Sequence, residues 1–181
     1  MARVPYVSRD QMDAEGQQIY DTIRQDRNAA EVGRQFRALL NSPKAAGYLT
    51  SLGTQLRFNS TIPDNLKELA IIMLARHWNS DLEWTGHSVM AKNAGLSDET
   101  IEKVRTHKTG ELTGEEAVIV KFVVEMLHDK NLTDGSFDAA QKILGDRGVV
   151  ELALTVGYYC AINLAQIALK PEMEPGRVST L

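Results

Sequence analysis

Two glutamates and a histidine, Glu68, Glu83 and His87, are the residues whose types and spacing best suit acid–base chemistry in this chain. Glu83 and His87 are four residues apart, so on a helix they lie one above the other on the same face. Glu68 lies in an almost wholly apolar run. Such surroundings disfavour a charge, so its carboxyl group is expected to be protonated and able to donate a proton. A histidine can transfer a proton at neutral pH, because its ordinary pKa is about 6.5.

Two helices joined by a short turn are needed to position these residues. Apolar side chains cover nearly every side of residues 66–75, which predicts a buried helix that carries Glu68. Ser80 followed three residues later by Glu83 is a capping box and predicts the start of a second helix. Because a short joint makes neighbouring helices antiparallel, Glu68 is expected to face Glu83 and His87 across a helical hairpin.

The residues of this hairpin resemble the carboxymuconolactone decarboxylase family, whose other main branch contains the alkyl hydroperoxidase D-like (AhpD-like) proteins. The resemblance is specific over roughly the central third of the chain, and the remainder is compatible with it by helix pattern. The positions that carry it are Glu68-Leu69-Ala70, Trp78, Glu83-Trp84, His87 and Gly95-Leu96.

The peroxidase branch of that family has a glutamate followed at fixed spacing by two cysteines and a histidine. Here Glu68 and His87 stand at the ends of the same spacing, but Ser80 and Glu83 occupy the positions of the two cysteines. The only cysteine of the chain is Cys160, so a Cys-x-x-Cys redox pair is absent. What remains resembles the decarboxylase branch, in which Glu83 and His87 match, while Glu68 is shared with the peroxidase branch.

The resemblance implies an all-α, AhpD-like helical bundle with a central helical hairpin. It also implies a cofactor-free decarboxylase, or a related lactone-processing enzyme, that acts on a small carboxylic acid. It implies neither a metal nor a cofactor. The expected partners are a small-molecule substrate and further copies of the chain, assembled as a homo-oligomer that is a trimer or a dimer of trimers.

Decarboxylation would give each candidate residue a role. Loss of CO₂ leaves carbanion character that must be delocalised and then protonated, so a general acid is required. His87 suits this step, Glu83 could orient it and raise its pKa, and Glu68 is a second candidate donor. Arg76 is a candidate clamp for an anionic substrate, and Trp84 is a candidate substrate contact.

Each of these residues also has a purely structural interpretation. Glu83 could serve only as the third helical residue of the capping box. Glu68 could form an ion pair with Arg76 or a salt bridge at a subunit interface, and His87 could be an ordinary buried histidine with its hydrogen bonds satisfied. Trp84 belongs to a residue type that more often fills a core than contacts a substrate.

Three other interpretations stay open beside the decarboxylase. Glu68, Glu83 and His87 form a donor set that could hold zinc or a non-haem metal. An AhpD-like alkyl hydroperoxidase or peroxiredoxin activity is suggested by the family but disfavoured, because no thiolate stands at the matched positions. The third is a non-catalytic oligomeric helical protein that has kept only the fold.

Composition and charge exclude several other classes. The net charge is −4 with both signs interspersed, which argues against a nucleic-acid-binding surface. No uninterrupted apolar run reaches the roughly 18–20 residues of a membrane span, and the first residues lack the apolar region of a secretory signal. These features predict a soluble protein of the cytoplasm with no membrane partner.

The length of 181 residues predicts a single all-α domain, since domains commonly contain about 100–150 residues. We divide it into an N-terminal helical extension over 1–59, a core over 60–170 and a polar tail over 171–181. No alternating strand pattern is present. Besides the hairpin, the patterns predict helices that span about residues 12–27, 43–58, 97–104, 113–127, 137–144 and 146–170, two of them opened by capping boxes at Ser8/Gln11 and Thr113/Glu116.

A short sequence echo suggests an internal helical repeat. Glu68-Leu69-Ala70 recurs as Glu151-Leu152-Ala153, an offset of 151 − 68 = 83 residues. The same offset carries Glu83 onto Gln166 and His87 onto Lys170. If the repeat is real, only its first copy has kept the ionisable residues.

Overall fold

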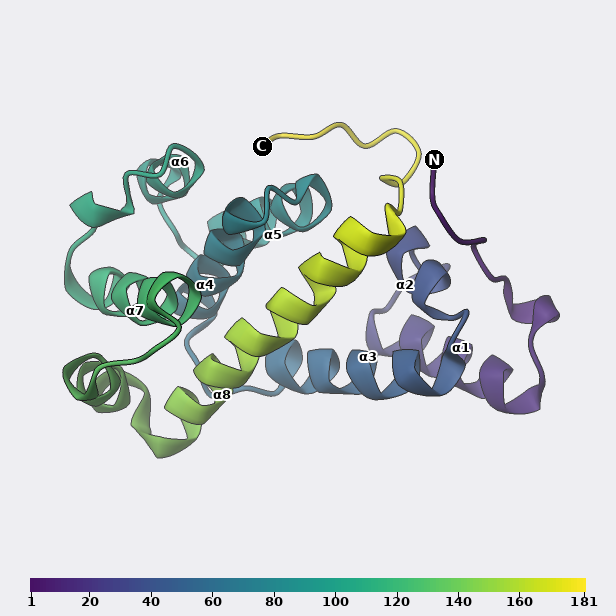
Figure 1. The fold of residues 1–181 in the computed structure, drawn as a ribbon, viewed down its shortest axis with the longest axis horizontal. Coiled ribbons are helices and arrows are strands. Elements are labelled where there is room, and N and C mark those ends of the chain that lie inside the picture. The colour runs from purple at the N-terminus through teal and green to yellow at the C-terminus, as the bar shows by residue number, and fades with distance from the viewer. The chain divides into compact units, whose positions relative to one another are not determined.

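The protein is built from helices alone, as the sequence predicts (Figure 1). The computed structural model describes residues 1–181 and contains no strand. Its elements are η1 (Arg9–Gln11), α1 (Ala14–Asp26), α2 (Arg34–Leu39), α3 (Pro43–Phe58), α4 (Asp64–His77), α5 (Asp81–Asn93), α6 (Asp98–Arg105), η2 (Thr109–Glu111), α7 (Gly114–Val124), η3 (Glu125–Asp129) and α8 (Asp134–Leu169).

The chain clusters into two compact units. The first contains Met1–Asn59 and Leu164–Val178, and the second contains Ser60–Asn163 and Ser179–Leu181. The division after Asn59 coincides with the predicted end of the N-terminal extension. Residues 164–178, by contrast, cluster with the N-terminal segment, whereas the predicted division places them in the core and the tail.

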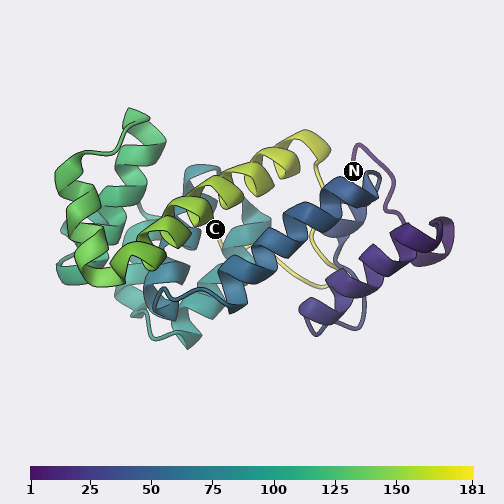
Figure 2. The same ribbon diagram turned by 90° about the horizontal axis from the view of Figure 1, so that it is seen from below.

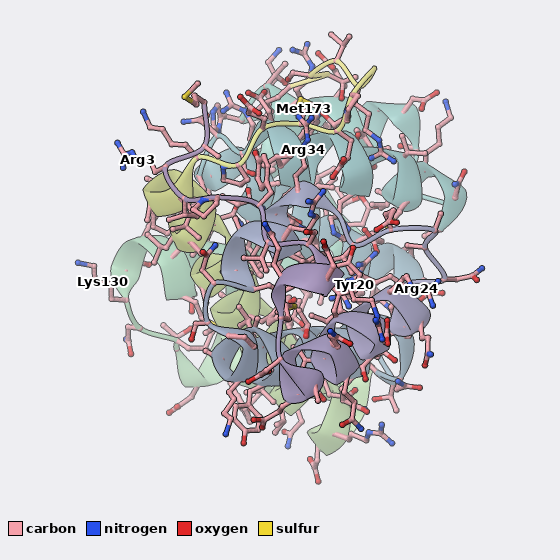
Figure 3. The ribbon with its side chains drawn as sticks, turned by 90° about the vertical axis from the view of Figure 1, so that its right-hand side faces the viewer. Arg3, Tyr20, Arg24, Arg34, Lys130 and Met173 are labelled. Atoms are coloured by element: carbon pink, nitrogen blue, oxygen red, sulfur yellow. The ribbon has the colours of Figure 1, made fainter.

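The first unit has its own apolar core between α1, α2 and α3, and Figure 2 shows α1 and α3 running alongside each other. The buried residues of this core are Tyr20, Ile23, Val32, Phe36, Leu40 and Ala46. The C-terminal segment packs onto the same unit near Arg34 and Met173, which are labelled in Figure 3. There Arg34 donates to the carbonyl oxygen of Met173 at 2.9 Å and, through its backbone N–H, to Glu174 at 2.6 Å.

The predicted capping box at Ser8 and Gln11 is present but opens only the short turn η1. The helix α1 begins later, where the Asp13 side chain accepts a hydrogen bond from the N–H of Gly16 at 2.8 Å. An aspartate cap satisfies one of the free N–H groups of a first helical turn as well as a serine does. The prediction of a helix start at Ser8 was therefore a few residues early.

The second unit is organised around α4 and α5, which pack side by side, with α6 and α7 also against α4 (Figure 1). Every residue of α4 from Leu66 to Ala75 is buried, so the nearly continuous apolar run was correctly read as a helix enclosed on most sides. The helix α5 ends at Asn93 and is followed by Ala94 and Gly95, whose φ of +98° suits a glycine after a helix C-terminus. The N–H of Leu96 donates to Ala91 and that of Gly95 to Lys92, which is a Schellman motif.

The start of α7 was predicted correctly, but its predicted capping box is wrong. The Thr113 side chain makes no capping hydrogen bond. Glu116, its expected partner, instead accepts from the Thr100 hydroxyl at 3.1 Å, and Thr100 belongs to α6. The helix then widens into the single π-turn η3, a rare element that often accompanies functional sites.

The long helix α8 is interrupted at Gly145, as the sequence predicts. Gly145 has φ 69° and ψ 176°, outside the helical region. By length and composition α8 could cross a membrane, yet a core helix of a soluble protein meets the same criterion, and 39% of its most apolar window is buried within the protein. Its Glu151 is also buried, and it accepts hydrogen bonds from the Thr61 N–H at 2.7 Å and from Arg147 at 2.8 Å.

Candidate functional site

The structure brings Glu68, Glu83 and His87 together on the facing sides of α4 and α5. The Nδ1 atom of His87 lies 2.7 Å from Oε2 of Glu68, and its Nε2 atom lies 3.4 Å from Oε2 of Glu83. One imidazole thus has a carboxyl group at each ring nitrogen. The expectation that the hairpin would bring the three side chains together is met geometrically, while the chemical roles of these residues remain predictions.

Local sequence explains why Glu83 can face His87. The Ser80 side chain caps α5 by accepting the Glu83 N–H at 3.3 Å. The N–H of Ser80 donates to the carbonyl oxygen of Ala75 at 2.8 Å, so it does not depend on the Glu83 carboxylate to satisfy it. The side chains of Glu83 and His87 meet because residues four apart are neighbours on a helix surface.

Tyr159 of α8 completes the cluster, although it is not among the site residues that the sequence predicts. Its hydroxyl lies 3.1 Å from Nε2 of His87, and the two rings meet edge to face at 5.2 Å. The buried side of α8 carries Leu152, Thr155 and Tyr159 at helical spacing, so its burial could have been predicted. The helix against which this side packs could not have been predicted, because a helical pattern does not specify its packing partner.

All four side chains of the cluster are shielded from water. Glu68, Glu83 and His87 are only 5–7% exposed and Tyr159 is 2% exposed. Burial acts to lower the pKa of His87, but its hydrogen bonds to Glu68 and Glu83, together with their charges, outweigh this effect and leave the pKa raised. The positively charged imidazolium is therefore favoured, and it can donate a proton from either ring nitrogen.

Two further predicted site residues, Arg76 and Trp84, have other contacts in the structure, and their roles at the site stay predictions. The guanidinium of Arg76 donates through Nε to the carbonyl oxygen of Arg105 at 2.7 Å, and its Nη1 donates to Asn79. Eight residues separate Arg76 from Glu68 on α4, which is about 12 Å along the helix axis. Trp84 is 1% exposed and belongs to the core, so packing is its observed role here.

The second copy of the short echo differs in its surroundings. Glu151 accepts from both the N–H and the hydroxyl of Thr61 and pairs with Arg147, and no histidine lies among its partners. These contacts lower the pKa of Glu151 in spite of its burial. The two glutamates thus share a local sequence but not a setting.

Cys160 lies on α8 and is partly exposed. Burial raises the pKa of its thiol, which opposes formation of the reactive thiolate. No group of three or more histidine, cysteine, aspartate and glutamate side chains is arranged to hold a metal ion.

The order and packing of these helices define an AhpD-like fold, without the cysteine pair of the peroxidase branch. No family model matches the sequence, and no curated protein is similar to it in sequence. The fold assignment therefore depends on similarity to solved structures.

Three such structures share the fold over nearly the whole chain. An uncharacterised peroxidase-related protein from Ralstonia eutropha JMP134, described as an alkylhydroperoxidase AhpD core, has a TM-score of 0.79 at 11% identity and covers 99% of this chain and 98% of its own. A peroxidase-related protein from Silicibacter sp. TM1040 has a TM-score of 0.75 at 11% identity, over 96% and 91%. The debrominase Bmp8 has a TM-score of 0.72 at 14% identity, over 96% and 92%.

Proposed function

We propose that this protein is a decarboxylase, or a related lactone-processing enzyme, that acts on a small carboxylic acid. His87 is the proposed proton donor. The observation that carries the proposal is the contact of one buried imidazole with two carboxyl groups, at 2.7 Å to Glu68 and 3.4 Å to Glu83. A purely structural histidine needs only its hydrogen bonds satisfied. A raised pKa and shielding from water are properties of a positioned acid.

The chemistry follows from this arrangement. When the bond to the carboxylate carbon breaks and CO₂ leaves, the electron pair passes into a conjugated carbonyl of the substrate. The His87 imidazolium then gives its proton to the carbanionic carbon, and the neutral imidazole regains a proton from water. Glu68, at Nδ1, would hold the ring in one orientation and favour its charged form, as a carboxylate partner does for a catalytic histidine.

Peroxidase chemistry is disfavoured, although two of the similar structures are described as peroxidase-related. Thiol-dependent reduction of a peroxide needs a thiolate nucleophile and a second thiol to resolve it. The chain has one cysteine, and Ser80 and Glu83 stand at the matched positions. Ser80 is already used as the cap of α5.

Self-association and location are part of the same proposal. Large apolar side chains remain exposed along α8, among them Val150, Leu154, Leu164 and Ile167, each between 47% and 56% exposed. Exposed large apolar side chains are frequent at interaction surfaces, and a second copy of the chain is the expected partner. We expect a cytoplasmic homo-oligomer, as a trimer or a dimer of trimers.

The proposal is tested by release of CO₂ from a panel of small lactone carboxylic acids, measured between about pH 5 and 9, a range that brackets the ordinary pKa of histidine. Wild-type protein is compared with His87→Ala, His87→Gln and the control Glu151→Gln, whose carboxylate is buried but lies with Thr61 and Arg147. We expect the His87 variants to lose about 10²–10⁴-fold in rate, as for removal of a general acid, and the control to keep it.

Circular dichroism of each variant establishes that it is folded. Equal rates in wild type and in a folded His87→Gln protein would remove His87 from the mechanism. If no acid in the panel is turned over, the decarboxylase assignment fails and a non-catalytic helical protein becomes the better description.

A further inference from the structure

A pocket in the Ser60–Asn163 unit gathers three of the four histidines of the protein. It has a volume of about 500 Å³ and is lined by Arg76, His77, His107 and His128, with apolar walls that include Met73 and Leu127. No residue of the Glu68, Glu83, His87 and Tyr159 cluster lines it. A concave site with apolar walls and a few convergent polar groups is the usual form of a small-molecule site.

The charges around this pocket are all of one sign. Arg76 is permanently cationic, the three histidines become cationic on protonation, and no aspartate or glutamate is among the lining residues. This contrasts with the net charge of −4 of the whole chain. An anionic ligand would therefore meet favourable charge here and no carboxylate.

The guanidinium of Arg76 is held in place but not used up. Its Nε donates to the Arg105 carbonyl oxygen and its Nη1 to Asn79, which fixes the plane of the group. No protein acceptor for its Nη2 is present. A fixed guanidinium with free N–H groups suits a carboxylate or a phosphate.

The backbone around the pocket is unusual at two places. His128 belongs to η3, the only π-helical turn of the chain, and its ring meets that of His77 edge to face at 5.1 Å. His107 has φ +59°, a left-handed conformation that is uncommon outside glycine. Such local departures from regular geometry are often found at functional sites.

We propose that this pocket binds a small organic anion. Its carboxylate or similar head group would contact Arg76 and the histidines, and its apolar body would pack against Met73 and Leu127. The pocket does not depend on the proposed enzymatic activity. It would take its ligand whether or not the His87 cluster is catalytic.

The pocket should also hold its ligand more tightly in mild acid. Burial, and then repulsion by His128 and His107, lower the pKa of His77. The titratable groups that act on His77 are those two histidines, from η3 and from the segment after α6, and the charged side chain of the lining is Arg76. A bound anion would favour the protonated imidazole of His77, so its affinity should rise as the pH falls below about 6.5, the ordinary pKa of histidine.

The test uses benzoate as the probe and the side-chain ¹H–¹³C NMR signals of the four histidines as the readout. Benzoate should shift the signals of His77, His107 and His128 at pH 6 and bind more weakly at pH 8, whereas neutral benzamide should bind much less. The signal of His87 reports separately on the candidate active site, so binding there cannot be mistaken for binding in this pocket.

Two variants complete the test. Arg76→Gln should weaken benzoate binding about tenfold or more, since a charged hydrogen bond is lost, while the control Arg105→Gln should leave it unchanged, because only the backbone of Arg105 contacts Arg76. His77→Gln, checked for folding, should weaken binding at pH 6 but not at pH 8, because it removes the imidazole that a bound anion would help to protonate. Equal affinity of Arg76→Gln and wild type, or shifts confined to His87, would overturn the proposal. Inorganic phosphate binding as tightly as benzoate would overturn the organic part of it.

Discussion

The imidazole of His87 on α5 lies 2.7 Å, Nδ1 to Oε2, from the carboxyl group of Glu68 on α4. The two residues are far apart in sequence, and only the hairpin brings them together. This contact is one of the two that raise the pKa of His87 against the effect of burial.

Replacing Glu68 by glutamine should lower the pKa of His87. The amide removes the negative charge next to Nδ1 but keeps the size of the side chain, so burial, which favours the neutral imidazole, gains influence. The pKa is measured from the ¹H–¹³C signals of the His87 ring as a function of pH. Glu151→Gln is the matched control and should leave the His87 titration unchanged; an unaltered titration in Glu68→Gln would show that the contact does not control the charge of the ring.

The stability of the protein should depend on pH through His87. Because the pKa is raised in the folded state, protonation of His87 stabilises the fold fully below about pH 6.5, the unfolded value, and this contribution is lost as the pH rises through the folded value. The difference in unfolding free energy between wild type and His87→Gln, from urea titrations, should therefore shift against the wild type above pH 6.5. A difference that is constant from pH 5 to pH 9 would contradict the raised pKa.

Tyr159→Phe should raise the activation free energy of the proposed reaction by more than it lowers the free energy of unfolding. The change removes only the hydroxyl that lies 3.1 Å from Nε2 of His87, and the ring remains to pack against the imidazole. Loss of one hydrogen bond costs about 0.5–1.5 kcal/mol of stability. Tyr158→Phe is the control, since it removes the hydroxyl of the adjacent buried tyrosine. If both variants retain full turnover, Tyr159 has only a packing role.

Gly145→Ala should destabilise the protein by about 1–3 kcal/mol, because φ 69° with ψ 176° is a conformation essentially restricted to glycine. No atom from other parts of the protein lies within 4 Å of the added methyl group, so the cost comes from the local backbone conformation and not from crowding by neighbours. Gly135→Ala, in the first turn of α8 and also free of close neighbours, should be neutral or slightly stabilising. Thermal unfolding of the two variants distinguishes them; equal melting temperatures would contradict the argument.

Much of the fold could be predicted from the sequence, because the start and end of a helix are determined mainly by residues close by in the sequence. Pro43 begins α3, Ser97 caps α6 and Gly95 ends α5, each by contacts within a few residues. The misreadings are of the same local kind. Thr113 has the right residue type for a cap, but its side chain makes no capping hydrogen bond, and the carboxylate of Glu116 accepts from Thr100 on another helix.

The candidate site could be predicted in part, for a reason visible in its geometry. Glu83 and His87 share one helix, and Glu68 lies on the next, so hairpin geometry alone was enough to bring them together. Tyr159 approaches from α8, more than seventy residues later, and no pattern in the sequence specifies that meeting. Arg76 lies two helical turns beyond Glu68 on α4, as its sequence position predicts, and its role as a clamp for an anionic substrate stays a prediction.

The tripeptide Glu-Leu-Ala occurs twice in this chain with two different fates. At Glu68 it meets a ring that can gain and lose a proton, whereas at Glu151 it holds the beginning of a neighbouring segment through Thr61. A search for reactive sites with a short sequence motif would find both glutamates and could not rank one above the other. Whether such a glutamate takes part in proton transfer or only stabilises the fold depends on the residue it contacts in the folded protein. Only a search by three-dimensional arrangement would therefore distinguish the two.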